Sequence, residues 1–133
     1  MPHLVILYTP NLEADAAMQR LCRTLADTML AQKDDEGRQV YPTGGTRVLA
    51  FPAAHYAVAD GSADHAFAYL NLRMASGRSE AVKKRIGDAI TAAAKAHFAP
   101  LLARRPVGIT FQIDEAPGQV YDAKIGNLHA FFG

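Results

Sequence analysis

The residue with the clearest chemical potential is Pro2, which follows Met1 and precedes an apolar run from Leu4 to Tyr8. Aminopeptidases remove an initiator methionine readily when the next residue is small, and proline qualifies. The mature chain would then begin with the secondary amine of Pro2. An α-amino group has an ordinary pKa of about 7.7–8.0, and burial at the start of a strand would lower it. Pro2 is therefore a candidate general base, and the alternative is a merely tolerated second residue.

Two arginines stand where a guanidinium group could bind an anion. Arg78 directly precedes a helix expected to begin near residue 80. Free backbone N–H groups at a helix start favour an anion and oppose a cation. An arginine in this place is explained if a carboxylate or enolate oxygen binds beside it. Arg47 follows a double glycine and precedes a short strand, which would hold its planar guanidinium near the strand start. Ordinary surface salt bridges are the alternative for both residues.

Other kinds of site have little support in the sequence. The five histidines are His3, His55, His65, His97 and His129. No pair has the i, i+4 spacing of helical metal ligands, so no metal site is expected. The chain has neither a phosphate-binding loop nor a Gly-x-Ser-x-Gly elbow. Cys22 falls on the apolar face of a predicted helix, which favours a buried, inert thiol over a nucleophile.

Composition narrows the class of protein further. A chain of 133 residues fits one compact domain, and its net charge of +1 provides no field that would favour nucleic acid or a membrane surface. A single cysteine cannot form an internal disulfide, which favours a reducing compartment. The apolar run near the N-terminus is too short for a signal sequence or a membrane span. We therefore expect a cytoplasmic protein with no membrane or nucleic-acid partner.

Hydrophobic patterning predicts four strands and two helices that would position the candidate residues. The expected strands are residues 4–8, 48–51, 66–74 and 107–113, and the expected helices are about residues 12–29 and 80–98. The order strand, helix, strand thus occurs twice. Each unit should make a right-handed crossover between parallel strands.

This order predicts an α+β fold in which two fused β-α-β units form a four-stranded sheet with two helices on one face. The expected organisation is a single domain over residues 1–133, with the first unit at about 2–58, the second at about 64–115 and a C-terminal tail at 116–133. One face of such a sheet would lack cover, and the tail ends in the apolar group Leu128, Ala130, Phe131 and Phe132. We therefore expect oligomerisation.

Four segments of the chain together resemble the 5-carboxymethyl-2-hydroxymuconate delta-isomerase family of the tautomerase superfamily. They are Pro2-His3 before an apolar strand, the Ala59-Asp60-Gly61 turn with Asp64, Ala66 and Phe67 after it, Gly77-Arg78-Ser79, and Asn127 to Phe132. The resemblance spans nearly the whole chain. It implies two fused β-α-β units, a homotrimer, an amino-terminal proline as catalytic base and no cofactor.

Carried over residue by residue, the resemblance implies that Pro2 moves a proton between two carbons of a small unsaturated 2-hydroxy or 2-keto dicarboxylic acid. Arg78 matches the arginine of the family's Gly-Arg-Ser segment and would bind a substrate carboxylate or stabilise the developing enolate. Arg47 matches the family's arginine before the second strand and would bind another carboxylate bidentately. Residues 48–57 depart from the family pattern, so the resemblance implies a reaction type rather than one substrate.

Two alternatives stay open at this point. Proline-based decarboxylases and dehalogenases share the expected fold and use the same terminus with different partner residues. A trimeric ligand-binding module in which Pro2 is blocked or inert would also fit the pattern. The favoured interpretation is a cofactor-independent isomerase whose partner is a small dicarboxylate substrate.

Overall fold

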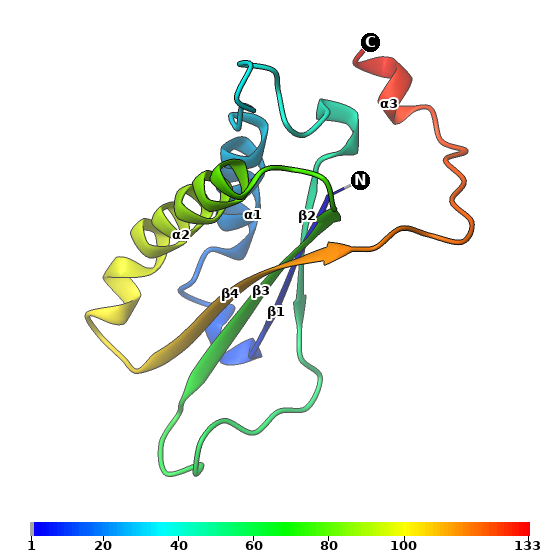
Figure 1. The fold of residues 1–133 in the computed structure, drawn as a ribbon. Helices are drawn as coiled ribbons and strands as arrows, with labels where there is room; N and C mark the ends of the chain where they lie inside the picture. Colours follow the sequence, from blue (N-terminus) through cyan, green and yellow to red (C-terminus); the bar gives the residue numbers. More distant parts are fainter. Residues whose placement is uncertain (1) are drawn as a thin grey trace.

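The computed structural model describes residues 2–133, in which two long helices cover one face of a four-stranded sheet (Figure 1). The strands are β1 (His3–Tyr8), β2 (Arg47–Pro52), β3 (Ala66–Ala75) and β4 (Val107–Ala116). The helices are α1 (Met18–Leu30), α2 (Glu80–Leu102) and the short α3 (Leu128–Phe131), and two 3-10 turns are η1 (Pro10–Leu12) and η2 (Thr43–Gly45).

The sheet has the strand order β2-β1-β3-β4. β1 pairs parallel with β2, and β3 pairs parallel with β4. The two β-α-β units meet where β1 and β3 run antiparallel at the centre of the sheet. The structure confirms the predicted α+β fold of two fused β-α-β units with both long helices on one face.

Side chains of β3 show how the strands divide the sheet into two faces. Alternate residues from Ala66 to Met74 are buried beneath the helices, and Leu70 and Leu72 are fully inaccessible. The residues between them, such as Tyr69 and Arg73, are less buried and point to the opposite face, because successive side chains of a strand alternate. We call the side away from α1 and α2 the uncovered face.

The helices close the core over the other face. Their buried residues are Met18, Leu21, Leu25, Ala26 and Met29 of α1 and Val82, Ile86, Ile90, Ala94, Phe98 and Leu101 of α2. This three-to-four-residue spacing places one apolar stripe of each helix on the sheet. No helix within residues 2–133 has the length and apolarity needed to span a membrane.

The first helix begins later than the sequence pattern predicted. The expectation of a helix from about residue 12 was wrong, because η1 ends at Leu12 and α1 starts at Met18. Ala17 has a left-handed backbone with φ of 47°, which interrupts helical geometry just before α1. The intervening turn is fixed from outside, since His97 Nε2 lies 2.6 Å from the carbonyl oxygen of Ala16.

Two elements extend beyond their predicted ends. α2 continues to Leu102 although Pro100 lies inside it, because a proline so near the helix end removes little of the hydrogen-bond ladder. β4 reaches Ala116, since its last residues stay in register with β3 up to the pair Ala75 and Ala116. The extension of β4 lengthens the sheet at the end where β1 begins, whereas the extension of α2 lies at the opposite end, where β4 starts.

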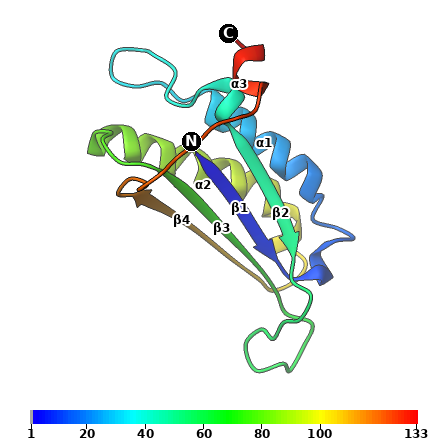
Figure 2. The ribbon, with the colours of Figure 1, turned by 90° about the vertical axis from the view of Figure 1, so that its right-hand side faces the viewer.

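The C-terminal tail crosses the end of the sheet near the start of β1 and reaches α3 on the far side (Figure 2). There α3 packs against η2. A Cβ atom on Gly44 would lie 2.5 Å from the Cα of His129, so the close approach requires glycine at this position. Much of the tail is exposed, including Tyr121, Ile125 and Phe131.

The core makes a first prediction. Replacing the fully buried Leu70 with Ala should lower the free energy of unfolding by roughly 2–5 kcal/mol, because it removes packed methyl groups and leaves a cavity. The matched change Leu102→Ala, at a leucine that is 46% exposed, should cost much less. Urea denaturation followed by circular dichroism at equal chain concentration measures both. Equal losses would contradict this description of the core.

Candidate active site

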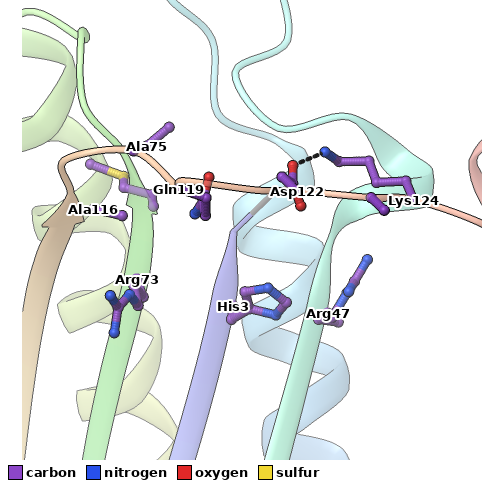
Figure 3. Close-up of a pocket in the computed structure, with 11 residues that line it drawn as sticks. His3, Arg47, Arg73, Ala75, Ala116, Gln119, Asp122 and Lys124 are labelled. Atoms are coloured by element: carbon purple, nitrogen blue, oxygen red, sulfur yellow. Dashed lines mark hydrogen bonds and ion pairs between the residues drawn. The ribbon is translucent and has the colours of Figure 1, made fainter.

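A cavity of about 230 Å³ lies where β1 and β2 begin and β3 and β4 end (Figure 3). Residues of all four strands line it, and the tail that follows β4 passes over it. The polar residues that line it are His3, Arg47, Arg73, Gln119, Asp122 and Lys124. The cavity therefore combines residues that are far apart in the sequence and is dominated by basic groups.

Strand register places three of these basic residues side by side. His3 on β1 pairs with Arg47 on β2 and with Arg73 on β3. Residues that are directly opposite on neighbouring strands point to the same face of a sheet. Figure 3 shows Arg73, His3 and Arg47 as a row beneath the tail. We call these three residues the basic row.

The two guanidinium groups of the basic row have no acidic partner within the described part of the chain. No carboxylate of residues 2–133 lies within ion-pair distance of Arg47 or Arg73. The cavity's own carboxylate, Asp122, pairs with Lys124 in the tail. An anionic ligand would supply the missing counter-charge.

The surroundings of His3 disfavour its protonated form. Burial lowers the pKa of His3 below its usual 6.5, and the positive charges of Arg47 and Arg73 lower it further. A neutral imidazole carries one donor and one acceptor nitrogen. The middle of the basic row is therefore a polar group whose protonation is disfavoured by the cations beside it.

Pro2 lies next to this cavity. It is buried and directly precedes His3 at the start of β1. The antiparallel register that pairs His3 with Arg73 places Pro2 level with Met74, which lines the cavity. The predicted removal of Met1 concerns a residue outside the described range.

Arg78 occupies a different environment from Arg47. Its Nη1 donates a hydrogen bond to the carbonyl oxygen of Ala75 at 2.8 Å, and its guanidinium carbon lies 5.2 Å from the ring centroid of Tyr41. It lines a second cavity, of about 270 Å³, with the loop of residues 34–40. The structure thus groups Arg47 with His3 and Arg73, whereas Arg78 contacts that cavity's lining through the carbonyl oxygen of Ala75.

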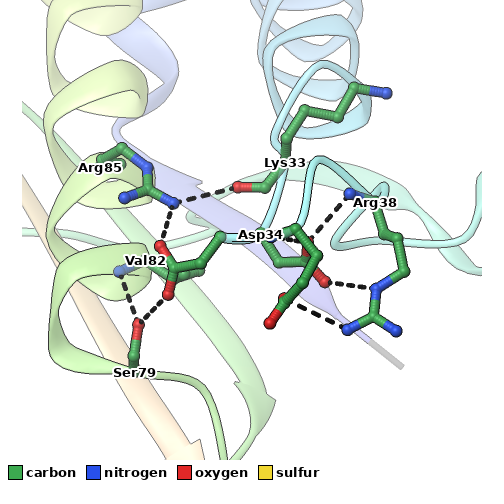
Figure 4. A network of polar contacts seen from close by, with 8 residues as sticks. Lys33, Asp34, Arg38, Ser79, Val82 and Arg85 are labelled. Atoms are coloured by element: carbon green, nitrogen blue, oxygen red, sulfur yellow. Dashed lines mark hydrogen bonds and ion pairs between the residues drawn. The ribbon is translucent and has the colours of Figure 1, made fainter.

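A polar network holds the 34–40 loop against the start of α2 (Figure 4). Asp35 accepts hydrogen bonds from Ser79 Oγ at 3.2 Å and from Arg85 Nη2 at 3.1 Å. Ser79 also caps α2, because its Oγ accepts from the backbone N–H of Val82 at 3.2 Å. The pKa of Asp34 is lowered, chiefly by the backbone N–H of Arg38. These contacts fix the backbone that directly follows Arg78 at the start of α2.

Arg73 and the tail residues were missed in the sequence. Arg73 stands near the end of an apolar run that predicts a strand, and strict alternation would have placed it with Tyr69 and Asn71 on one face. A cation at such a position is a usable signal. The contribution of Asp122 and Lys124 depends on the path of the tail, which has no periodic pattern.

Two further features bear on the chemistry of the chain. Cys22 is partly buried, and burial raises the pKa of its thiol, which disfavours the reactive thiolate. Within residues 2–133, no three potential metal ligands of the His, Cys, Asp and Glu types are grouped together.

The fold and the family comparison together identify the protein as an isomerase. The family model of 5-carboxymethyl-2-hydroxymuconate isomerase matches residues 2–132, and the chain belongs to this family.

Known relatives match this chain over nearly its full length. The chain is 26% identical to the 5-carboxymethyl-2-hydroxymuconate Delta-isomerase of Escherichia coli over 132 residues, which are 99% of each protein. A crystal structure of a 5-carboxymethyl-2-hydroxymuconate delta-isomerase is 62% identical, with a TM-score of 0.95 over 100% of this chain and 93% of the other. A 5-carboxymethyl-2-hydroxymuconate isomerase from Deinococcus radiodurans R1 is 35% identical, with a TM-score of 0.84 over 99% and 94%.

The arrangement of the basic row predicts how the pKa of His3 responds to a mutation. Arg47→Gln removes one positive charge beside His3 and should raise the pKa of His3 partway toward 6.5, since burial remains. NMR titration of the His3 ring protons measures this shift. The change Arg20→Gln, at an exposed arginine on α1, should leave it unchanged.

The same shift has a defined sign for stability. Because the folded-state pKa of His3 lies below its unfolded value of 6.5, the unfolded chain binds the proton more readily. His3 therefore destabilises the folded state as the pH falls below 6.5, and this loss is absent at higher pH. An unchanged His3 titration in Arg47→Gln would contradict the proposed electrostatic coupling.

Proposed function

We propose that this isomerase moves a proton within a small unsaturated 2-hydroxy or 2-keto dicarboxylic acid similar to 5-carboxymethyl-2-hydroxymuconate. The observation that carries the proposal is the cavity beside Pro2, in which two guanidinium groups lack an acidic partner within the described residues. The named activity of the relatives supports the same substrate class. Carboxylates of the substrate would supply the counter-charges that the cavity lacks.

In this proposal Pro2 is the general base. Removal of Met1 would free its secondary amine at the buried start of β1. Desolvation and the nearby charges of Arg47 and Arg73 disfavour the protonated amine, so its pKa would fall and the free base would be present near neutral pH. The amine would take a proton from a carbon adjacent to the conjugated carbonyl system and return it to another carbon. One base suffices, and no cofactor is needed.

The arginines would control charge on the substrate. Arg47 would bind one carboxylate through its planar guanidinium group. Arg78 would bind another carboxylate or stabilise the dienolate oxygen, because a fixed cation stabilises the negative charge that develops as the proton leaves. Its fixed position against Tyr41 and Ala75 supports this role, since a group already in place needs no reorganisation during the reaction.

We also propose that the protein acts as a cytoplasmic homotrimer. On the uncovered face of the sheet, Leu7, Leu49 and Phe51 are exposed by 50%, 46% and 49%. Large apolar side chains grouped in this way favour contact with another subunit. The lone Cys22 suits a reducing compartment.

The role of Pro2 makes a direct prediction. Pro2→Ala should lower kcat/KM for isomerisation of a 2-hydroxymuconate-type dienol by roughly 10²-fold or more, because the positioned secondary amine is lost. Pro106→Ala, at an exposed proline before β4, should keep full activity. Absorbance of the conjugated dienol follows both reactions.

The native N-terminus provides an independent check. Mass spectrometry of the protein purified from cells should show a chain that lacks Met1. Retention of Met1, or undiminished turnover by Pro2→Ala, would refute Pro2 as the base. Retention of Met1 together with no turnover of the dienol would leave a non-catalytic ligand-binding module as the better interpretation.

The arginines make a further prediction. Arg47→Gln and Arg78→Gln should reduce kcat/KM on dicarboxylate dienols by roughly 10-fold or more, because each change removes a charged hydrogen bond to the substrate. Arg20→Gln is the control, because this exposed side chain lies on α1. Activity of both variants equal to that of the control would contradict their assigned roles.

A further inference from the structure

The proposed mechanism assigns no role to Arg73. It lies near the end of β3, lines the cavity and belongs to the basic row. The β3 residues that share its face, Tyr69 and Asn71, donate hydrogen bonds to Gln112 and Asp114 of β4. An arginine here requires an explanation from its contacts.

Two carboxylates lie near Arg73 but bind other residues. Asp114 is its register partner on β4, but Asp114 Oδ2 accepts a hydrogen bond from Asn71 Nδ2 at 2.8 Å. Asp122, above the basic row, pairs with Lys124. Within residues 2–133 no hydrogen bond or ion pair joins Arg73 to either carboxylate. Arg73 thus does not form a structural ion pair with either carboxylate.

The separation of the two arginines is set by the sheet. Arg47 and Arg73 flank His3 on its two neighbouring strands, so their backbones are about 10 Å apart, which is two strand spacings. Among the residues that line the cavity, the three cations Arg47, Arg73 and Lys124 outweigh the single carboxylate of Asp122. A single carboxylate near one guanidinium would leave the other without a counter-charge.

We infer that Arg73 is a specificity-determining residue that binds the carboxylate at the opposite end of the substrate from Arg47. The inference rests on the proposed function, since it assigns a further contact at that site. A dicarboxylate lying across His3 neutralises both guanidinium groups. A monocarboxylate satisfies only one side of the basic row, which makes the cavity selective for dicarboxylates.

Equilibrium binding of unreactive probes tests the inference without relying on turnover. Adipate is a saturated six-carbon dicarboxylate, and hexanoate is its monocarboxylate counterpart. Calorimetric titration of the mature wild-type protein should show tighter binding of adipate. Arg73→Gln should weaken adipate by at least 10-fold and hexanoate by less than about 2-fold, because only the dicarboxylate reaches Arg73. Arg73→Lys should restore part of the adipate affinity, and Arg20→Gln is the control.

Kinetic measurements add a second readout. Arg73→Gln should raise KM for a dicarboxylate dienol with a smaller change in kcat, and should leave kcat/KM for a monocarboxylate dienol nearly unchanged. Equal losses on both substrates, or no loss in either Arg73 variant, would overturn the inference. Thermal melting of each variant verifies folding, and Arg73→Lys provides the test if Arg73→Gln does not fold.

The two proposals fail in different ways. If the wild-type protein isomerises the dienol but Arg73→Gln keeps the wild-type preference for dicarboxylates, the assignment of Arg73 is wrong and the proposed function stands. If the wild-type protein binds adipate through Arg73 but does not turn over any dienol, the proposed function is wrong and the selectivity of the cavity stands.

Discussion

The pairing of β1 with both of its neighbours is the constraint on which the site depends. β1 is flanked by β2 in parallel and by β3 in antiparallel orientation, and one register on each side brings Arg47 and Arg73 level with His3. A shift of one residue on either side would turn a guanidinium toward the helices, where it would meet an apolar core. The burial of Leu4 and Leu72 on the helix face opposes such a shift. Packing on the helix-covered face of the sheet therefore fixes the positions of the charged side chains on the uncovered face.

The parts of this structure that follow from local pattern are the ones that the sequence predicted well. Alternation in β4 and the continuous apolar runs of β1 and β3 identify the strands, and the repeated order identifies the fold. The start of α1 was misjudged, because the left-handed Ala17 and the contact from His97 to Ala16 come from tertiary structure rather than from periodicity. The end of α2 was misjudged because Pro100 is tolerated in its last turns.

The candidate site was only partly predictable, for a related reason. Arg47 and Arg78 come after glycines at the edges of predicted elements, and this local position identified them as candidates. Arg73 lies within a strand, so its relation to His3 exists only once β1 and β3 are paired. Arg78 is near the basic row in sequence order but is turned toward Tyr41, and no spacing in the sequence reports the direction of that side chain. Long-range pairing thus decides which charges act together.

The contact between Gly44 and α3 has a consequence for how this site could change over generations. The tail that passes over the cavity is held at one end by β4. At its other end, the backbone of His129 packs against Gly44, which has no side chain. A larger residue at position 44 would force the backbone of His129, at the far end of the tail, to shift. Access to the cavity could therefore be altered by a substitution remote from it, while the charges that select the ligand stayed in place.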